Sequence, residues 1–162
     1  MKLALLATAA VLAAAPAAAA LPRPGVLVPS LSLAGVRLGE PAAQVKASLG
    51  LRYGVCRGCA ATTWYFTYRP FTRQGLAVEL IRGRVTAVYT VWKPAGWRGP
   101  GGLRIGTVEA QVTSVAGPLI PIVCTNYDAL TRDAPHARTV YYVVDGKLWG
   151  FGLLRPHANP CR

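Results

Sequence analysis

The hydrophobic pattern in the first half of the chain returns in the second half. Residues 35–50 match residues 102–117 at an offset of 67, with seven identical positions among sixteen. In each copy, two apolar residues four positions apart share one helical face, and we expect both pairs to be buried: Val45 with Leu49, and Val112 with Ala116. The pattern therefore predicts an internal repeat that begins with a short helix in each copy.

The residues that flank these two segments fit the ends of helices. Glu40 and Thr107 stand where a side chain can cap a helix N-terminus, and Pro41 fits the first helical position, which needs no N–H donor. Gly50 and Gly117 supply the left-handed backbone that commonly ends a helix. We therefore expect both helices to end at these two glycines.

The repeat continues, at an offset of 63, into segments rich in strand-forming residues. Residues 78–85 match residues 141–148, and each segment contains a two-residue turn: Arg82-Gly83 and Asp145-Gly146. Such turns favour hairpins, and Asp-Gly is a strong type I′ signal. The pattern therefore predicts a helix, a strand and a hairpin in each unit. The fold class is α+β, with two tandem repeats forming one six-stranded antiparallel sheet and the helices packed on one face.

The two turns fix which residues of each hairpin pair, and alternation along the strands then assigns each strand residue to a face of this sheet. On the helix-covered face we expect Trp64, Phe66, Tyr68, Val78, Leu80, Val85, Ala87, Tyr89, Val91, Tyr141, Val143, Leu148, Gly150 and Leu154. The other face would be open to solvent. Its predicted binding residues are Tyr65, Arg69, Glu79, Arg84, Trp92, Tyr142, Lys147, Trp149 and Phe151.

This mixture of aromatic and charged residues is typical of protein interfaces, where aromatics and Arg supply most of the binding energy. The alternative is that the protein's own chain covers these rings. Two segments could do so, namely the extended arm at Pro22–Ser32 and the C-terminal tail held by Cys161. An exposed apolar patch of this size is rarely without function.

The first twenty residues are typical of a cleaved signal peptide. Lys2 precedes an uncharged apolar run, and Ala18-Ala19-Ala20 offers small residues for cleavage before Leu21. We therefore predict a signal at 1–20 and a single secreted domain at 21–162. Its parts are repeat one at about 33–92, a linker at 93–101, repeat two at about 102–154 and the tail at 155–162. No later segment approaches the length of a membrane span. The product is expected to be a soluble extracytoplasmic monomer.

Four cysteines remain after the signal: Cys56, Cys59, Cys124 and Cys161. In an exported protein an even number favours two disulfides, although four cysteines allow three connectivities. One arrangement closes a small ring at Cys56–Cys59 and ties Cys124 to Cys161. A four-cysteine zinc site would need a second close pair, and a redox Cys-x-x-Cys belongs at a helix N-terminus. We expect no metal and no cofactor.

Charge is strongly positive but scattered. The chain carries a formal charge of +12, and loss of Lys2 with the signal leaves +11. Specific nucleic-acid binding favours a clustered basic stripe, which is absent from the sequence. Attraction to anionic envelope polymers follows from net charge alone. A polyanion-binding protein therefore stands as an alternative function.

The helix segments resemble those of two known families. The motif G-x-[RK]-[LI]-G-x-x-x-A-Q-V-x-x-x-x-G, followed by aromatic strands and a glycine-turn hairpin, is similar to the secreted β-lactamase-inhibitor protein family, which has two such units. It is also similar to the small outer-membrane assembly lipoprotein family, which has one. The resemblance covers most of Leu33–Leu154 and implies protein binding through the open sheet face. The tight Cys56–Cys59 pair departs from the inhibitor family, and no lipid-bearing Cys follows the signal.

Residues that would support catalysis do not gather in the sequence. His136 and His157 lie in Pro-adjacent stretches, and Ser48 and Ser114 lie inside the predicted helices without a nucleophile motif. Glu79 is the one carboxylate expected among the aromatics, and a hydrolase centred on it is the less favoured alternative. The sequence therefore predicts a non-catalytic module that binds an extracellular protein or envelope polymer.

Overall fold

The computed structural model describes residues 25–66, 75–91 and 96–162. Its first half contains β1 (Leu27–Val28), β2 (Ser32–Leu33), α1 (Ala42–Leu49), β3 (Gly54–Val55), β4 (Thr62–Phe66), β5 (Leu76–Ile81) and β6 (Arg84–Thr90). Its second half contains the 3-10 turn η1 (Pro100–Gly102), α2 (Glu109–Ala116), β7 (Ile120–Val123), β8 (Asp128–Ala134), β9 (Ala137–Val144) and β10 (Lys147–Leu154). The predicted signal at 1–20 lies outside the described residues.

One antiparallel sheet of eight strands dominates the fold, in the order β3-β4-β5-β6-β10-β9-β8-β7. The α+β class is confirmed, but the predicted count of six strands was wrong because β3 and β7 add a strand at each edge. Both halves run from a helix into a four-stranded meander, and β6 pairs with β10 where the two meanders meet. Descent from one duplicated unit stays a prediction.

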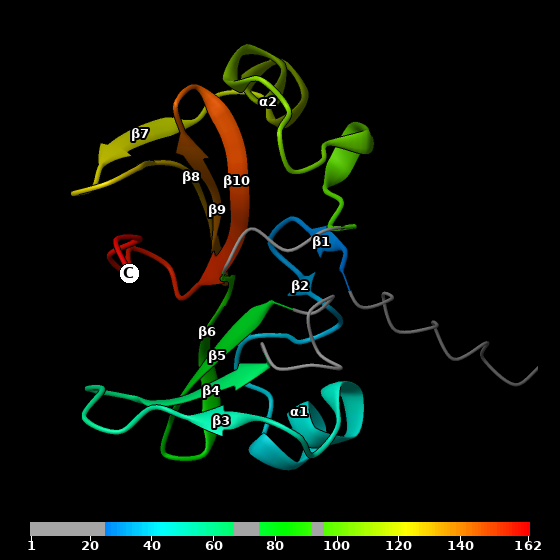
Figure 1. Ribbon diagram of the computed structural model, residues 1–162, viewed down its shortest axis with the longest axis vertical. Helices are drawn as coiled ribbons and strands as arrows, with labels where there is room; N and C mark the ends of the chain where they lie inside the picture. Colours follow the sequence, from blue (N-terminus) through cyan, green and yellow to red (C-terminus); the bar gives the residue numbers. More distant parts are fainter. Residues whose placement is uncertain (1–24, 67–74, 92–95) are drawn as a thin grey trace, which may run out of the picture.

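The main core lies between the sheet and its helices. Figure 1 shows α1 and α2 at opposite ends of one side of the sheet, with β1 and β2 between them. Val45, Leu49, Val112 and Ala116 are buried in one cluster with sheet residues such as Val78, which confirms both predicted helix faces. The described part of the predicted arm is not extended over the open face. Leu27 and Leu33 pair as β1 and β2 and pack into this core.

The C-terminal ends of both helices agree with the sequence-based prediction, whereas their N-terminal ends differ from it. Gly50 and Gly117 have φ of +91° and +78°, and their N–H groups bond to carbonyls four residues back. Glu40 and Thr107, however, do not cap the helices. Each side chain accepts an N–H from three residues earlier in the chain and closes the turn before its helix. Pro41 is the N-cap residue rather than the first helical residue.

A bulge interrupts each central hairpin. Glu79 pairs with Ala87 while Leu80 pairs with Val85, so Thr86 is an extra residue in β6. Likewise Tyr142 pairs with Gly150 while Val143 pairs with Leu148, which leaves Trp149 unpaired in β10. An extra residue reverses the faces of all that follow it in the strand.

The face assignments beyond each bulge were therefore wrong. Ala87, Tyr89 and Leu154 belong to a second cluster on the face opposite the helices, where Val91 also packs. Phe151, predicted on the open face, is instead fully buried in the helix-side core. Before the bulges the assignments hold, since Trp64, Phe66, Val78, Leu80, Val85, Tyr141, Val143 and Leu148 all lie in the helix-side core. Tyr68 lies outside the described residues.

Both sheet edges are poor templates for another strand. Just beyond β7, the backbone N–H of Cys124 donates to the carbonyl of Tyr127. In this register the backbone groups of the even-numbered residues point toward β8, and the backbone nitrogen of Pro121 points toward the open edge. Proline has no N–H to offer there. At the other edge β3 has only two residues and runs into the Cys56–Cys59 ring. Contacts with other molecules are therefore expected through side chains of a face.

The cysteines form the two predicted pairs. The sulfur atoms of Cys56 and Cys59 lie 1.92 Å apart, and those of Cys124 and Cys161 lie 2.02 Å apart. The predicted linker is anchored rather than free where it is described, since Trp97 is fully buried in the helix-side core. No helix in the described ranges is long and apolar enough to cross a membrane.

Candidate functional site

A groove of about 780 Å³ lies on the face opposite the helices. Five aromatic rings line it, drawn from both halves of the chain: Tyr65, Tyr89, Tyr127, Tyr142 and Trp149. Val55, Val91 and Val144 add apolar surface, while Thr90, Asn126 and Arg162 add polar groups. We call this feature the aromatic groove.

The bulges decide which rings enter the aromatic groove. Tyr65 reaches it through the simple alternation of β4, whereas Tyr89 reaches it because the bulge at Thr86 reverses β6. Trp149 is itself the extra residue of β10. Tyr142 forms the floor, with its ring edge-to-face against Tyr127 at a centroid distance of 5.5 Å. Burial raises the pKa of Tyr142 and, together with the charge of Glu79, that of Tyr89.

The C-terminal tail, residues 155–162, runs along this same face. Figure 1 shows it on the side of the sheet away from α1 and α2. Cys161 ties the tail to Cys124 just beyond β7. The hydroxyl of Tyr127 donates to the carbonyl of Arg162 at 2.9 Å, and the N–H of Arg162 donates back to the same hydroxyl. The tail therefore covers part of the open face, as the covering alternative predicted, while Tyr65 and Trp149 stay partly exposed.

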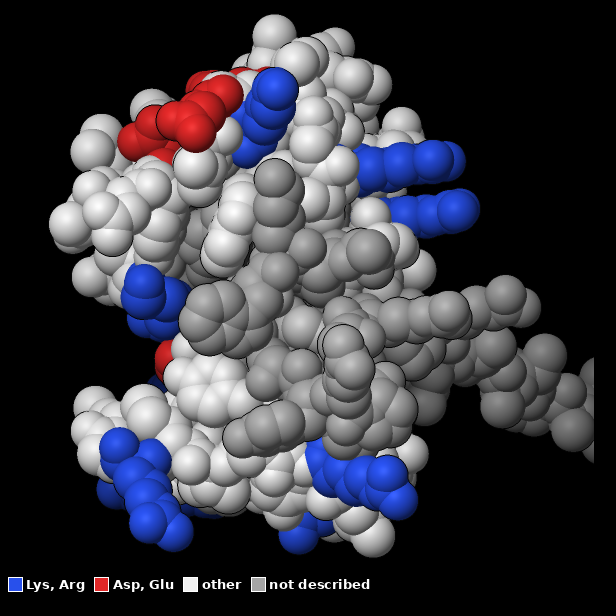
Figure 2. Space-filling model, viewed as in Figure 1, with Lys and Arg blue, Asp and Glu red and all other residues white. Residues whose placement is uncertain are grey.

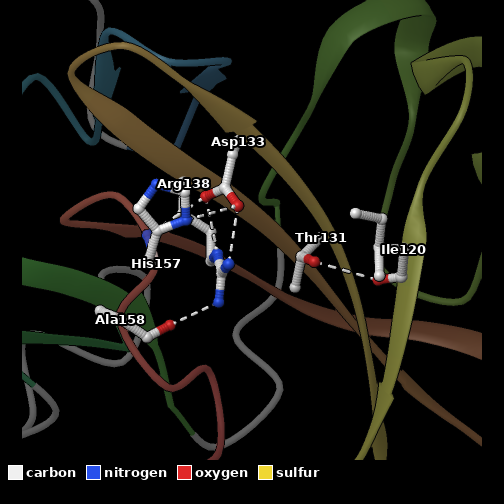
Figure 3. Close-up of polar contacts among 6 residues, drawn as sticks. All are labelled: Ile120, Thr131, Asp133, Arg138, His157 and Ala158. Atoms are coloured by element: carbon white, nitrogen blue, oxygen red, sulfur yellow. Dashed lines mark hydrogen bonds and ion pairs between the residues drawn. The ribbon is translucent and has the colours of Figure 1, made fainter.

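The start of the tail is held by an ion pair on the sheet. Figure 3 shows a bidentate ion pair between Arg138 and Asp133. Nε and Nη2 of the guanidinium lie 2.8 and 2.7 Å from the two carboxylate oxygens. The remaining Nη1 donates to the carbonyl of Ala158 at 2.7 Å. The N–H of His157 also donates to Asp133. Two neighbouring strands thus fix where the tail begins.

This ion pair gives a pH-dependent prediction. The hydrogen bonds from Arg138 lower the pKa of Asp133 from 3.8 to about 2. A lowered folded-state pKa stabilises the protein above about pH 4, and the gain is lost as pH falls toward 2. Because the Asp133 side chain is 26% exposed, we expect Asp133→Asn to cost only about 1 kcal/mol at neutral pH.

Urea unfolding at several pH values checks this prediction. The difference between wild type and Asp133→Asn should be constant above about pH 5 and vanish near pH 2. Asp128→Asn, an exposed position at the start of the same strand, is the matched control and should follow the wild-type curve. A difference for Asp133→Asn that grew as pH fell would show that the ion pair is not the stabilising contact.

The predicted binding residues divide into four groups. Tyr65, Tyr142 and Trp149 line the aromatic groove, and Glu79 lies at its side in contact with Arg162. Arg84 and Lys147 instead lie beside the segments that lead into the helices. The Arg84 side chain donates to the carbonyl of Gly39, and the backbone of Lys147 forms an isolated β-bridge with that of Val108. Phe151 is in the core on the other face. Arg69 and Trp92 lie outside the described residues.

Among the groove residues that the sequence did not identify, three make the contacts described above: Tyr89, Tyr127 and Arg162. Tyr89 was assigned to the core because the bulge at Thr86 leaves no mark in the alternating pattern of β6. Tyr127 stands in the turn between β7 and β8, where periodicity assigns no face. Arg162 enters only because the second disulfide brings the tail back across the sheet. The pairing of Cys124 with Cys161 was the one signal that pointed to it.

The groups that could support catalysis lie apart from one another in the described ranges. No group of three or more His, Cys, Asp or Glu residues lies close enough there to hold a metal ion. His136 is exposed in the turn between β8 and β9, and His157 lies beside Asp133 with its side chain 84% exposed. Glu79, the acid of the hydrolase alternative, forms an ion pair with Arg162.

Comparison with known proteins identifies no family. No family model matches the chain, and no curated protein matches it. Among solved structures, a DUF4309 family protein (YjgB) from Bacillus subtilis is similar with a TM-score of 0.44 and 9% identity, over 71% of this chain and 78% of that one. The resemblance to the inhibitor and assembly lipoprotein families therefore stays a prediction.

Proposed function

We propose that this chain is a secreted, non-catalytic binding module that docks a protein partner in the aromatic groove. The observation that carries the proposal is the gathering of five aromatic side chains from both halves of the sheet around one groove. Tyr and Trp are the residues that most often dominate protein interfaces, because they bury large area with little loss of conformational freedom. In this proposal the two halves are copies of one ancestral unit, and the molecule acts as a monomer outside the cytoplasm.

The groove favours a polypeptide partner over a charged polymer. Its lining is mostly aromatic and aliphatic, and Arg162 is the one charged residue among the residues that line it. On the face drawn in Figure 2, Lys and Arg are spread over both ends of the molecule rather than gathered in one stripe. A polyanion would therefore meet dispersed charges, whereas an apolar protein segment would meet one continuous surface.

Affinity capture from the culture filtrate of the producing cells tests the proposal. The immobilised mature chain is compared with Trp149→Ala/Tyr65→Ala, which removes two partly exposed rings of the groove. We expect recovery of a specific partner to fall by roughly 10- to 100-fold in this variant, since each interface aromatic contributes on the order of 1 kcal/mol or more. Quantitative mass spectrometry of the eluates supplies the measurement.

A control variant removes apolar side chains from elsewhere on the surface. Leu51→Ala/Val108→Ala does so, since these residues are 77% and 52% exposed and neither lines the groove. This variant should recover the partner as well as wild type does. Equal recovery by the groove variant would refute docking there. Loss of all recovery in moderately raised salt would instead favour the polyanion alternative.

A further inference from the structure

The side chain of Arg162 reaches the aromatic groove and lies among the residues that line it. Its Nε lies 3.3 Å from Oε1 of Glu79, and its guanidinium carbon lies 5.7 Å from the centroid of the Tyr89 ring. The Arg162 and Glu79 side chains are only 24% and 18% exposed. This contact is therefore largely shielded from water, unlike a typical surface ion pair.

The pocket that receives Arg162 is built by the sheet rather than by the tail. Glu79 comes from β5, Tyr89 from β6 and Tyr142 from β9, while Tyr127 stands just before β8. Tyr89 lies close enough to Glu79 for the charge of the carboxylate to help raise the pKa of the tyrosine. Glu79, Tyr89 and Tyr142 therefore hold their places within strands of the sheet, whereas the hydroxyl of Tyr127 is bonded to the backbone of the tail.

One polar group in this pocket has no partner. Tyr142 lines the groove, and its hydroxyl is buried and makes no hydrogen bond among the described residues. It is close enough to Arg162 for the positive charge to act on it. An unsatisfied buried hydroxyl is uncommon in folded proteins, and a ligand group that carries a donor or an acceptor would satisfy it.

This combination of groups matches a guanidinium ion. A planar guanidinium can lie against an aromatic face while its N–H groups reach a carboxylate and nearby hydroxyls. A carboxylate shielded by rings is also costly to leave without a cation. Arg162 lies one residue beyond Cys161, so its side chain can leave the pocket while the disulfide stays intact.

We propose that Glu79, Tyr89 and Tyr142 form a guanidinium-binding subsite that Arg162 occupies in the free protein, while the hydroxyl of Tyr127 binds the backbone of the same residue. A partner docks by placing an arginine side chain in this subsite and displacing Arg162. The identity of that partner rests on the function proposed above, whereas the subsite stands on the contacts of Glu79, Tyr89 and Tyr142.

The test uses Nα-acetyl-arginine methylamide as the probe and the full mature chain as the receptor. Arg162→Ala empties the subsite, so it should bind the probe at least roughly tenfold more tightly than wild type by NMR titration. Glu79→Gln in the Arg162→Ala background removes the carboxylate and should abolish this gain. The lysine analogue of the probe should bind Arg162→Ala more weakly than the arginine probe does, because it lacks the planar fork.

Thermal unfolding gives a second measurement with the ion itself. Millimolar guanidinium chloride, compared with equal sodium chloride, should raise the melting temperature of Arg162→Ala and leave that of wild type unchanged. The subsite proposal is overturned if wild type and Arg162→Ala bind the probe with equal affinity. It is also overturned if Arg162→Ala and Arg162→Ala/Glu79→Gln bind the probe with equal affinity.

The two proposals can fail separately. If Arg162→Ala binds the probe while Trp149→Ala/Tyr65→Ala still recovers every partner, the subsite stands and docking in the groove fails. If the groove variant loses its partner while Arg162→Ala gains no affinity for the probe, docking stands and the guanidinium subsite fails.

Discussion

Replacing Cys124 and Cys161 together by Ser should lower the free energy of unfolding by about 4 kcal/mol. The bridge joins residues 37 apart in sequence, and a loop of this length carries a large closure entropy in the unfolded chain. The change also releases the tail, whose remaining anchors are the Asp133–Arg138 pair and the contacts of Arg162. Urea unfolding at neutral pH measures the loss, and hydrogen exchange should show faster exchange in residues 159–162.

The other disulfide is the internal control for this result. Cys56 and Cys59 lie only three residues apart, so the same loop argument gives a loss of about 1.5 kcal/mol for Cys56→Ser/Cys59→Ser. Exchange in the tail should not change in this variant. A larger loss from the tight pair than from the long one would contradict the argument that loop closure dominates.

Phe151→Ala should be among the most destabilising single substitutions, with a loss of about 3–5 kcal/mol. The ring is fully buried, packs edge-to-face with Tyr141 at 6.1 Å, and leaves no room for a side chain at Gly99, where a Cβ would lie 2.9 Å from it. Removing it leaves a cavity between the sheet and the segment before η1. Equilibrium unfolding with an unchanged m-value would give the size of the loss.

Trp149→Ala is the matched comparison, because it removes a larger ring only two positions away. Trp149 is partly exposed on the groove face, so its loss should cost about 1 kcal/mol. A regular strand would place positions 149 and 151 on the same face. If the two substitutions cost the same, or if Trp149→Ala costs more, the bulge at Trp149 is not present in solution.

Local chemistry made part of this fold predictable. Arg82 and Gly83 have φ of 51° and 71°, and Asp145 and Gly146 have φ of 49° and 66°, as a type I′ turn requires. These turns fixed the start of each hairpin, so the residues nearest to them were assigned to the correct face. The helix-ending glycines were predictable for the same reason, because few other residues adopt a left-handed backbone at low cost.

The parts that could not be predicted depend on contacts distant in sequence. Neither Thr86 nor Trp149 is unusual in a strand, so nothing local marks them as extra residues. The two edge strands β3 and β7 are too short or too irregular in pattern to stand out. Tyr127 meets Arg162 across 35 residues, and that contact exists only once the sheet and the second disulfide have formed.

The candidate site shows the same division. Alternation assigned Tyr65, Tyr142 and Trp149 to the correct face, because no bulge stands between them and the positions from which the alternation was counted. Tyr89 and Phe151 come after a bulge, so each lies on the face opposite to the one predicted. The duplicated pattern directed attention to the correct surface of the sheet. It contained no information on the tail that partly covers that surface.

The contact between Thr90 and Gly150 restricts how this sequence can change over time. A Cβ at position 150 would clash with Oγ1 of Thr90, and that oxygen also accepts the N–H of Phe151 at 2.9 Å. A lineage that gains a side chain at 150 must therefore first lose the hydroxyl at 90, and with it a buried hydrogen bond. Related sequences should vary at these two positions together or at neither.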